Sequence, residues 1–213
     1  MNLRSKNLQN ADLRDVELQG VDLRDADLRS ADLRGVNLQR ADLQGADLFN
    51  ANLIYADLRG VNLRNVNLRC ADLRKARLRN ADLQGADLRS ADLRVANLSY
   101  TNLQNVDLRN ANSRSVDFNG ADLRGINLQG ADLRYSNLRG TDLRKAGIKI
   151  NMIYGLEWDI QIIQGWISIG CRSHSLEEWR SFTDREIRQM DRGALEWWRV
   201  NKNWIISICE NLN

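Results

Sequence analysis

A leucine recurs every five residues from Leu3 to Leu143, without an insertion or a deletion. The 29 repeats have leucine at the centre except at Ser113 and Phe118. A small or β-branched residue stands two places before most centres, with 16 alanines and 7 valines at this position. Asp or Asn precedes the centre in 27 repeats, and Arg or Gln follows it in 25. Each repeat therefore carries two apolar and three polar positions.

This period of five fits neither of the regular secondary structures. An α-helix repeats every 3.6 residues and a β-strand every 2.0, so neither could keep these leucines on one face. The chain must turn at regular intervals, with leucine and alanine inward and the polar positions outward. One coil cannot bury its own leucines, whereas coils stacked about 4.8 Å apart complete a shared core. The pattern predicts a solenoid.

The consensus A(D/N)LRx resembles the A(D/N)LXX motif of the pentapeptide-repeat family over about two thirds of the chain. The resemblance implies a mainly β fold for residues 1–147, a right-handed quadrilateral β-helix with four repeats in each coil. About seven such coils would form a rod about 35 Å long. In that fold Ser113 would mark a gap or a bend, and Lys6, at an inward position, would mark a frayed first coil.

Residues 148–213 form a second domain of different composition, because all six tryptophans lie in the last 56 residues. Residues 148–154 are interpreted as a transition, and the segments LEWDIQII and WISIGC around Gln164-Gly165 predict a β-hairpin. Capping boxes at 175–178 and 183–186 predict the starts of two short helices. We expect this Trp-rich hairpin-plus-helices domain to be a small α+β cap for the open end of the last coil. A longer helix over about 193–212 would bury Leu195, Trp198, Ile205, Ile206 and Cys209.

Composition and charge exclude several classes of protein. No apolar run is long enough to span a membrane, and the polar start lacks the apolar region of a signal peptide, so a cytoplasmic protein is expected. Three separated cysteines do not form a disulfide framework. The repeats hold 23 basic and 19 acidic residues, so the arginine rows should be neutralised by aspartates, which argues against nucleic-acid binding.

One face of the coils is a candidate protein-binding surface. If four repeats form a coil, residues 20 apart stack in columns, and one arginine column then lies beside outward apolar and aromatic residues. Arginine beside exposed aromatic residues is typical of protein interfaces, although single exposed apolar residues are also ordinary. Both interpretations stay open. The candidate residues are Phe49, Ile54, Tyr55, Arg74, Arg94, Val95, Arg114, Arg134 and Tyr135.

No group of residues predicts catalysis, a metal or a cofactor. Cys171-x-x-His174 has a spacing seen in metal sites, but zinc needs four ligands, and Cys209, Asp159 or Glu177 would have to be recruited. No orienting group completes a nucleophilic pair. We expect Cys171 to pack in the small core and His174 to cap a turn.

The segments IGCRSHSLEEW and MD…ALEWW resemble a C-terminal segment of phage and prophage pentapeptide-repeat proteins. The chain is therefore expected to be a non-enzymatic interaction scaffold that binds and inhibits a bacterial host protein. Two alternatives remain: a DNA mimic that modulates DNA gyrase or topoisomerase, as family analogy implies, and nucleic-acid binding through the arginine ladders. The uncapped first coil also allows a homodimer.

Overall fold

The computed structural model describes residues 2–144, 146, 150–153, 160–163, 166–169, 172–191 and 193–210. The chain divides into two compact units, Met1–Ile148 and Lys149–Asn213. Each unit has its own secondary structure and its own core, and each is described separately below.

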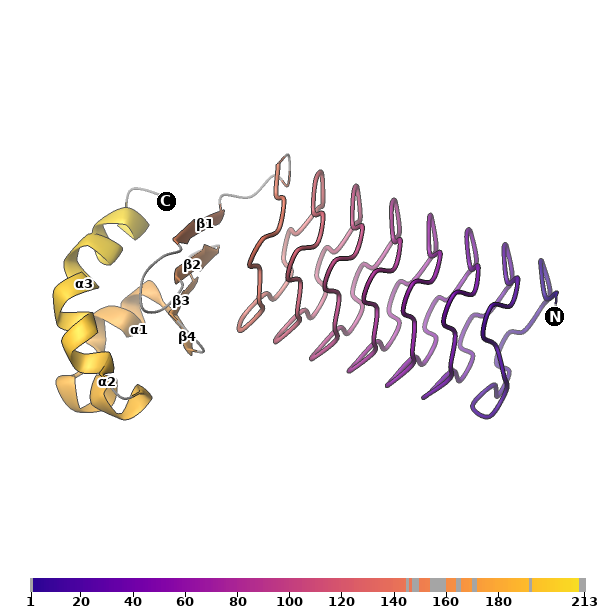
Figure 1. Ribbon diagram of the computed structural model, residues 1–213, viewed down its shortest axis with the longest axis horizontal. Helices are drawn as coiled ribbons and strands as arrows, with labels where there is room; N and C mark the ends of the chain where they lie inside the picture. Colours follow the sequence, from indigo (N-terminus) through magenta and orange to yellow (C-terminus); the bar gives the residue numbers. More distant parts are fainter. Residues whose placement is uncertain are drawn as a thin grey trace. The chain divides into compact units, whose positions relative to one another are not determined.

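The repeat unit consists of coils stacked side by side (Figure 1). From Asn2 to Asp122, and with the exception of Glu17, the residue before each centre forms a parallel bridge with the residue 20 positions further on, as in Asp72 with Asp92. Four repeats therefore make one coil, as predicted. We number the four sides of a coil from the repeat centred on Leu3, so that Leu18, Leu38 and every twentieth residue after them lie on the fourth side.

The backbone of a typical repeat leaves none of its five amides without an acceptor. Two amides donate to the following coil, one to the preceding coil, one to the turn before, and one to a side chain. This complete pairing explains why the fold tolerates a backbone without long strands. The bonds of one repeat are Ala91 N to Leu88 O (3.1 Å), Asp92 N to Ala71 O (3.0 Å), Leu93 N to Asn112 O (2.8 Å), Arg94 N to Asp92 Oδ1 (3.1 Å) and Val95 N to Arg114 O (3.1 Å).

The side-chain acceptor explains why Asp or Asn precedes nearly every centre. Its Oδ1 accepts the backbone amide two residues on, which closes a short Asx turn at the corner. Glu17 does the same through Oε1. Arg77 has no acceptor to offer, and within residues 2–144 the amide of Arg79 is the one at this position without such a bond.

The last residue of each repeat adopts a left-handed conformation. From Ser5 to Gly140 these residues have φ between 53° and 71°, apart from Asp15. Gly, Asn and Ser occupy most of these positions, as expected for residues that tolerate positive φ. Val95 has φ 63°, although a β-branched side chain strongly disfavours this region.

The interior contains the leucines and the small residues, which are buried from Leu18 to Leu138. Ser113 and Phe118 are both fully buried, and Ser113 N still donates to Asp132 O at 2.9 Å. The expected gap or bend at Ser113 therefore interrupts no backbone hydrogen bond of the ladder. Lys6 is exposed, yet its side of the first coil keeps the ladder, with Leu8 N to Asp27 O at 2.7 Å. On the fourth side, within residues 2–144, no bridge or backbone hydrogen bond joins Glu17 and Leu18 to Asn37, so the first coil is frayed there and not at Lys6.

The second unit begins with four antiparallel strands in sequence order, β1 (Ile150–Ile153), β2 (Ile160–Ile163), β3 (Trp166–Ile169) and β4 (Arg172–Ser175). Ile163 pairs with Trp166, which confirms the β2–β3 hairpin, while its turn residues 164–165 lie outside the described residues. The sequence did not predict β1 or β4 as strands. Both extend the hairpin into a sheet.

Three helices follow: α1 (Leu176–Ser181), α2 (Asp184–Met190) and α3 (Ala194–Glu210) (Figure 1). Both predicted capping boxes are confirmed, with Ser175 capping α1 and Thr183 capping α2. None of the helices described here is long and apolar enough to cross a bilayer.

The helices and the sheet share one core. Trp179 of α1 is buried, and its Nε1 donates to the carbonyl of Ile167 in β3 at 2.7 Å. Its ring centroid lies 5.0 Å from that of Trp198 in α3. Leu195, Trp198 and Ile205 are buried as predicted, Ile206 is half-buried, and the Cys209 side chain lies outside the described residues.

Candidate functional site

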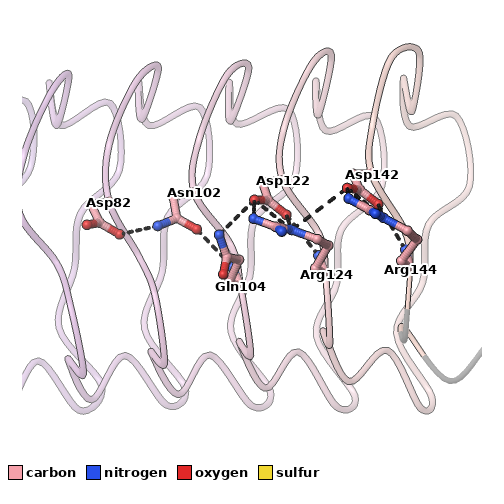
Figure 2. A network of polar contacts seen from close by, with 7 residues as sticks. All are labelled: Asp82, Asn102, Gln104, Asp122, Arg124, Asp142 and Arg144. Carbon is pink, nitrogen blue, oxygen red and sulfur yellow. Dashed lines mark hydrogen bonds and ion pairs between the residues drawn. The ribbon is translucent and has the colours of Figure 1, made fainter.

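Polar side chains form continuous ladders along the sides of the repeat unit. Figure 2 shows one on the first side, where Asn102 Nδ2 donates to Asp82 Oδ1 at 2.9 Å and Gln104 Nε2 donates to Asp122 Oδ2 at 2.8 Å. The ladder continues to Asp142 through Arg124, whose Nε lies 3.8 Å from Asp142. The outer surface is thus ordered by contacts between coils.

Twelve arginines stand two residues after an aspartate and bind it through both Nε and Nη2. The Nη2–Oδ2 distances are 2.5–2.6 Å. These hydrogen bonds lower the pKa of most of the aspartates. The pKa falls to about 2 at Asp12, Asp22 and Asp142. The prediction that arginine and aspartate columns neutralise each other is confirmed for these pairs.

Acid is expected to destabilise the repeat unit below about pH 4. The pKa of Asp12 is about 2 in the folded state against an ordinary value of 3.8, so the folded chain binds fewer protons in this interval. The stabilisation is complete above the ordinary pKa and is lost as the pH falls toward about 2. Thermal unfolding followed by circular dichroism should show a constant midpoint from about pH 8 to 5 and a fall below about pH 4. A midpoint that rises between about pH 4 and 2 contradicts this contribution.

The candidate arginines lie at the turn between the third and fourth sides, and aspartates engage most of them. Arg74, Arg94 and Arg134 each bind the carboxylate two residues earlier. Arg114 follows Asn112 instead, and its Nε lies 3.9 Å from Asp132. Its guanidinium lies 5.7 Å from the centre of the Tyr135 ring. Arg114 is therefore held less tightly than the other three.

The apolar candidates form a spaced column at the same turn. Tyr55, Val95 and Tyr135 are 58%, 56% and 43% exposed. They are 40 residues apart, so about 10 Å separates each from the next at about 4.8 Å per coil. Ile54 is half-buried beside Tyr55. The column is therefore a row of single anchors and not one continuous apolar patch.

Cations from neighbouring coils hold the exposed rings in place. Lys75 Nζ donates to Tyr55 Oη at 2.7 Å and lies 4.9 Å from the ring centroid. Phe49 lies at the preceding turn, between the second and third sides, with the Arg69 guanidinium 5.7 Å from its ring centroid. These contacts are cation–π pairs. Phe49 therefore lies at the opposite edge of the third side from Tyr55.

Sequence reasoning missed Tyr100 and Lys75. Tyr100 is 53% exposed at the turn after the fourth side, and the Arg79 guanidinium lies 5.2 Å from its ring centroid. Its position as the last residue of a repeat was the available signal, because that position always faces outward at a turn.

His174 lies in β4 and packs among aromatic rings. Its ring centroid lies 5.3 Å from Trp179 and 4.8 Å from Phe182, both edge-on. Burial lowers the pKa of His174. His174 is therefore half-buried against these two rings and does not cap a turn as expected. Cys171 and Asp159 lie outside the described residues, and the described side chains contain no group of three His, Cys, Asp or Glu placed to hold a metal ion.

The similarity of this chain to known proteins lies in its repeats. The family model described as "Pentapeptide repeats (8 copies)" matches residues 7–45, 46–85, 76–112 and 114–146. No curated protein is similar enough in sequence to be matched to this chain. The phage-type resemblance of the C-terminal segment has no counterpart in the family match, which ends at residue 146.

Three solved structures are similar to this chain. HetL, a pentapeptide repeat protein involved in heterocyst differentiation regulation in the cyanobacterium Nostoc sp. strain PCC 7120, is 35% identical, and the match covers 67% of this chain and 74% of HetL with a TM-score of 0.51. A pentapeptide repeat protein from the Arabidopsis thaliana thylakoid lumen is 31% identical over 50% of this chain and 70% of its own, with a TM-score of 0.43. QnrB1, a plasmid-mediated fluoroquinolone resistance protein, is 19% identical over 68% and 74%, with a TM-score of 0.36. The likeness to HetL implies a right-handed β-helix, and with repeats matched over more than half of its length, this chain belongs to the pentapeptide-repeat family.

Proposed function

We propose that the protein is a non-enzymatic scaffold that binds a protein partner through the turn column of Tyr55, Val95 and Tyr135. The observation that carries the proposal is the fixed exposure of these side chains on a hydrogen-bonded ladder. Tyrosine supplies a large contact area at a low entropy cost, and it is enriched among residues that dominate binding energies. Because the coil already orders these anchors, little further ordering is needed on binding.

The backbone at Val95 supports this interpretation. A β-branched residue at φ 63° is strained, and its exposed side chain gains no burial in return. Other repeats place Asn or Gly at the equivalent turn position, with φ between 54° and 71°. Strain without a structural benefit is found most often at binding surfaces.

The proposed partner is a protein of a bacterial host, which the chain would bind and inhibit in the cytosol. The support for this setting is the resemblance of the C-terminal segment to those of phage and prophage proteins. A homodimer through the first coil is part of the proposal, because Val16 at an inward position there is 36% exposed.

The test replaces the three anchors by the residue that suits the turn. The variant Tyr55→Asn, Val95→Asn, Tyr135→Asn should keep its fold and gain about 1 kcal/mol or more at position 95, because Asn tolerates positive φ. Affinity capture from a bacterial lysate should recover a defined partner with the wild type and lose it with this variant. Loss of binding together with equal or higher thermal stability excludes unfolding as the cause.

The control is Gln129→Ala, which changes an exposed residue on the second side and should leave capture unchanged. A partner recovered equally by the wild type and the triple variant contradicts the proposed column.

The described surface does not favour DNA mimicry of the kind expected from family analogy. A mimic of duplex DNA needs rows of uncompensated carboxylates, whereas twelve aspartates here each bind an arginine. A gyrase supercoiling assay without any effect of the protein would remove this alternative.

A further inference from the structure

The pairing of arginine with aspartate is interrupted on the fourth side. Arg77 stands where every other repeat has Asp, Asn or Glu. Lys75 lies at the turn before it and Arg79 at the turn after it, so three cations cross this side in one coil. We call these residues, with two arginines of the preceding coils, the fourth-side cation cluster. Its members are Arg40, Arg59, Lys75, Arg77 and Arg79.

Two of the five cations of this cluster, Arg59 and Arg77, share one carboxylate, Asp57. Asp57 receives Nε and Nη2 of Arg59 at 2.8 and 2.6 Å, and Gln39 Nε2 donates to it at 3.2 Å. Arg77 Nη1 lies 3.8 Å away, and the Asp57 side chain is only 15% exposed. Within residues 2–144, the other three cations of the cluster make no ion pair. The cluster therefore has a local excess of positive charge.

Two tyrosines hold the ends of the row. Lys75 donates to Tyr55 Oη, and the Arg79 guanidinium lies over the Tyr100 ring. Tyr100 Oη in turn accepts from Asn119 Nδ2 at 3.3 Å. A neutral ring orders a cation without cancelling its charge. Lys75 and Arg79 are thus positioned for an anion.

Arg77 lies in the middle of the row with its side chain 67% exposed. It replaces the side-chain acceptor that every other repeat supplies, so the Arg79 amide lacks its Asx bond. The turn therefore gains no hydrogen bond from the Arg77 side chain. A planar guanidinium in this place can bind a carboxylate through two parallel hydrogen bonds.

We propose that the fourth-side cation cluster binds a short acidic segment of a protein partner. This inference deepens the scaffold function proposed above and rests on it, because it names the chemistry of the partner. Tyr55 of the turn column contacts Lys75 of the cluster, so that one partner could contact both surfaces together. Charge complementarity of this kind speeds association and excludes partners of the wrong charge.

The surroundings favour an acidic protein segment over a nucleic acid. In the same column as Arg77, Glu17 and Asp117 lie on either side of the cluster, and Asp72 and Asp92 line the neighbouring third side. The distance from residue 57 to residue 117 is three coils, or about 14 Å. A long polyanion would run onto these carboxylates, and its affinity depends on many phosphate contacts. A short acidic segment ends within the cluster.

The test measures binding of a fluorescein-labelled octaglutamate peptide to the full chain by fluorescence anisotropy at low ionic strength. The variant Lys75→Asn, Arg77→Asn, Arg79→Gln uses residues found at the same positions of other repeats, so it should fold. The matched control Arg29→Gln, Arg89→Gln, Arg109→Gln removes the same charge from paired arginines on the second side. We expect binding to weaken about tenfold or more in the first variant and less than about threefold in the control.

Three results would overturn the inference: no octaglutamate binding by the wild type, an equal loss in both variants, or tighter binding of single-stranded octathymidylate than of octaglutamate. The last result would assign the cluster to nucleic acid. These outcomes leave the scaffold proposal intact when lysate capture still depends on Tyr55, Val95 and Tyr135. Conversely, if lysate capture does not depend on Tyr55, Val95 and Tyr135 but octaglutamate still binds, the turn column is rejected and the cation cluster is not.

Discussion

Replacing Trp179 by alanine should unfold the second unit while the repeat unit stays folded. Trp179 is buried between the sheet and α3, and it donates to the Ile167 carbonyl. Truncating a buried tryptophan costs about 3–5 kcal/mol, which is a large part of the stability of a small unit. The two units have separate cores, so the loss should be confined to one of them.

The two units can be observed separately in one sample. All six tryptophans lie in the second unit, so fluorescence excited at the tryptophan band reports on that unit alone. The β signal in far-ultraviolet circular dichroism should keep its wild-type transition in Trp179→Ala. Val200→Ala, at a position 78% exposed in α3, is the control and should change neither signal. A joint loss of both signals in Trp179→Ala would show that the units unfold together.

Ser113 and Phe118 should behave as one compensating pair. They are the two exceptions to leucine, they lie in consecutive repeats of one coil, and both are fully buried. The large phenylalanine makes up part of the interior volume that the small serine gives up. Ser113→Leu alone should overpack the coil and cost about 1–3 kcal/mol, although it removes a buried hydroxyl without a partner.

Phe118→Leu alone should leave a void and cost about 1–3 kcal/mol. The double variant should recover to within about 1 kcal/mol of the wild type, with a coupling energy of about 1–3 kcal/mol. Urea unfolding of the four proteins measures the cycle, and Leu43→Ala, more than three coils away in the core, serves as an uncoupled reference. Additive effects of the two single changes would contradict compensation.

The five-residue period predicted the interior of the repeat unit almost residue by residue. This was possible because each position has one role, and the position before the centre must also accept a turn amide. The capping boxes at Ser175 and Thr183 likewise predicted α1 and α2 from local contacts alone. Local sequence patterns therefore predict the structure where the conformation of each residue is set by contacts with residues close to it in the sequence.

Other elements depend on partners that are distant in the pattern. Strand β4 reads Arg-Ser-His-Ser, which has no apolar alternation, and its extended form comes from pairing with β3. His174 in this strand is placed by Trp179 and Phe182, which no turn signal could indicate.

The candidate surface was predicted only in part. The stacking of residues 20 apart placed Tyr55, Val95 and Tyr135 in one column. The cation cluster on the fourth side was not predicted, because the net charge of all repeats does not show where the pairing of arginine with aspartate fails. The single sign was Arg77 in an Asp position. Its importance depends on Asp57 being already engaged by Arg59, which is a matter of geometry.

The hydrogen bonds between coils run along the axis of the repeat unit, and this has a mechanical consequence. A force that pulls residues 2 and 144 apart loads the ladder of the end coil first, so coils should peel away one after another. Each coil holds 20 residues and would release about 70 Å of extended chain. Under tension the unit should therefore lengthen in equal steps, and a partner bound across several coils would act as a clamp on those steps.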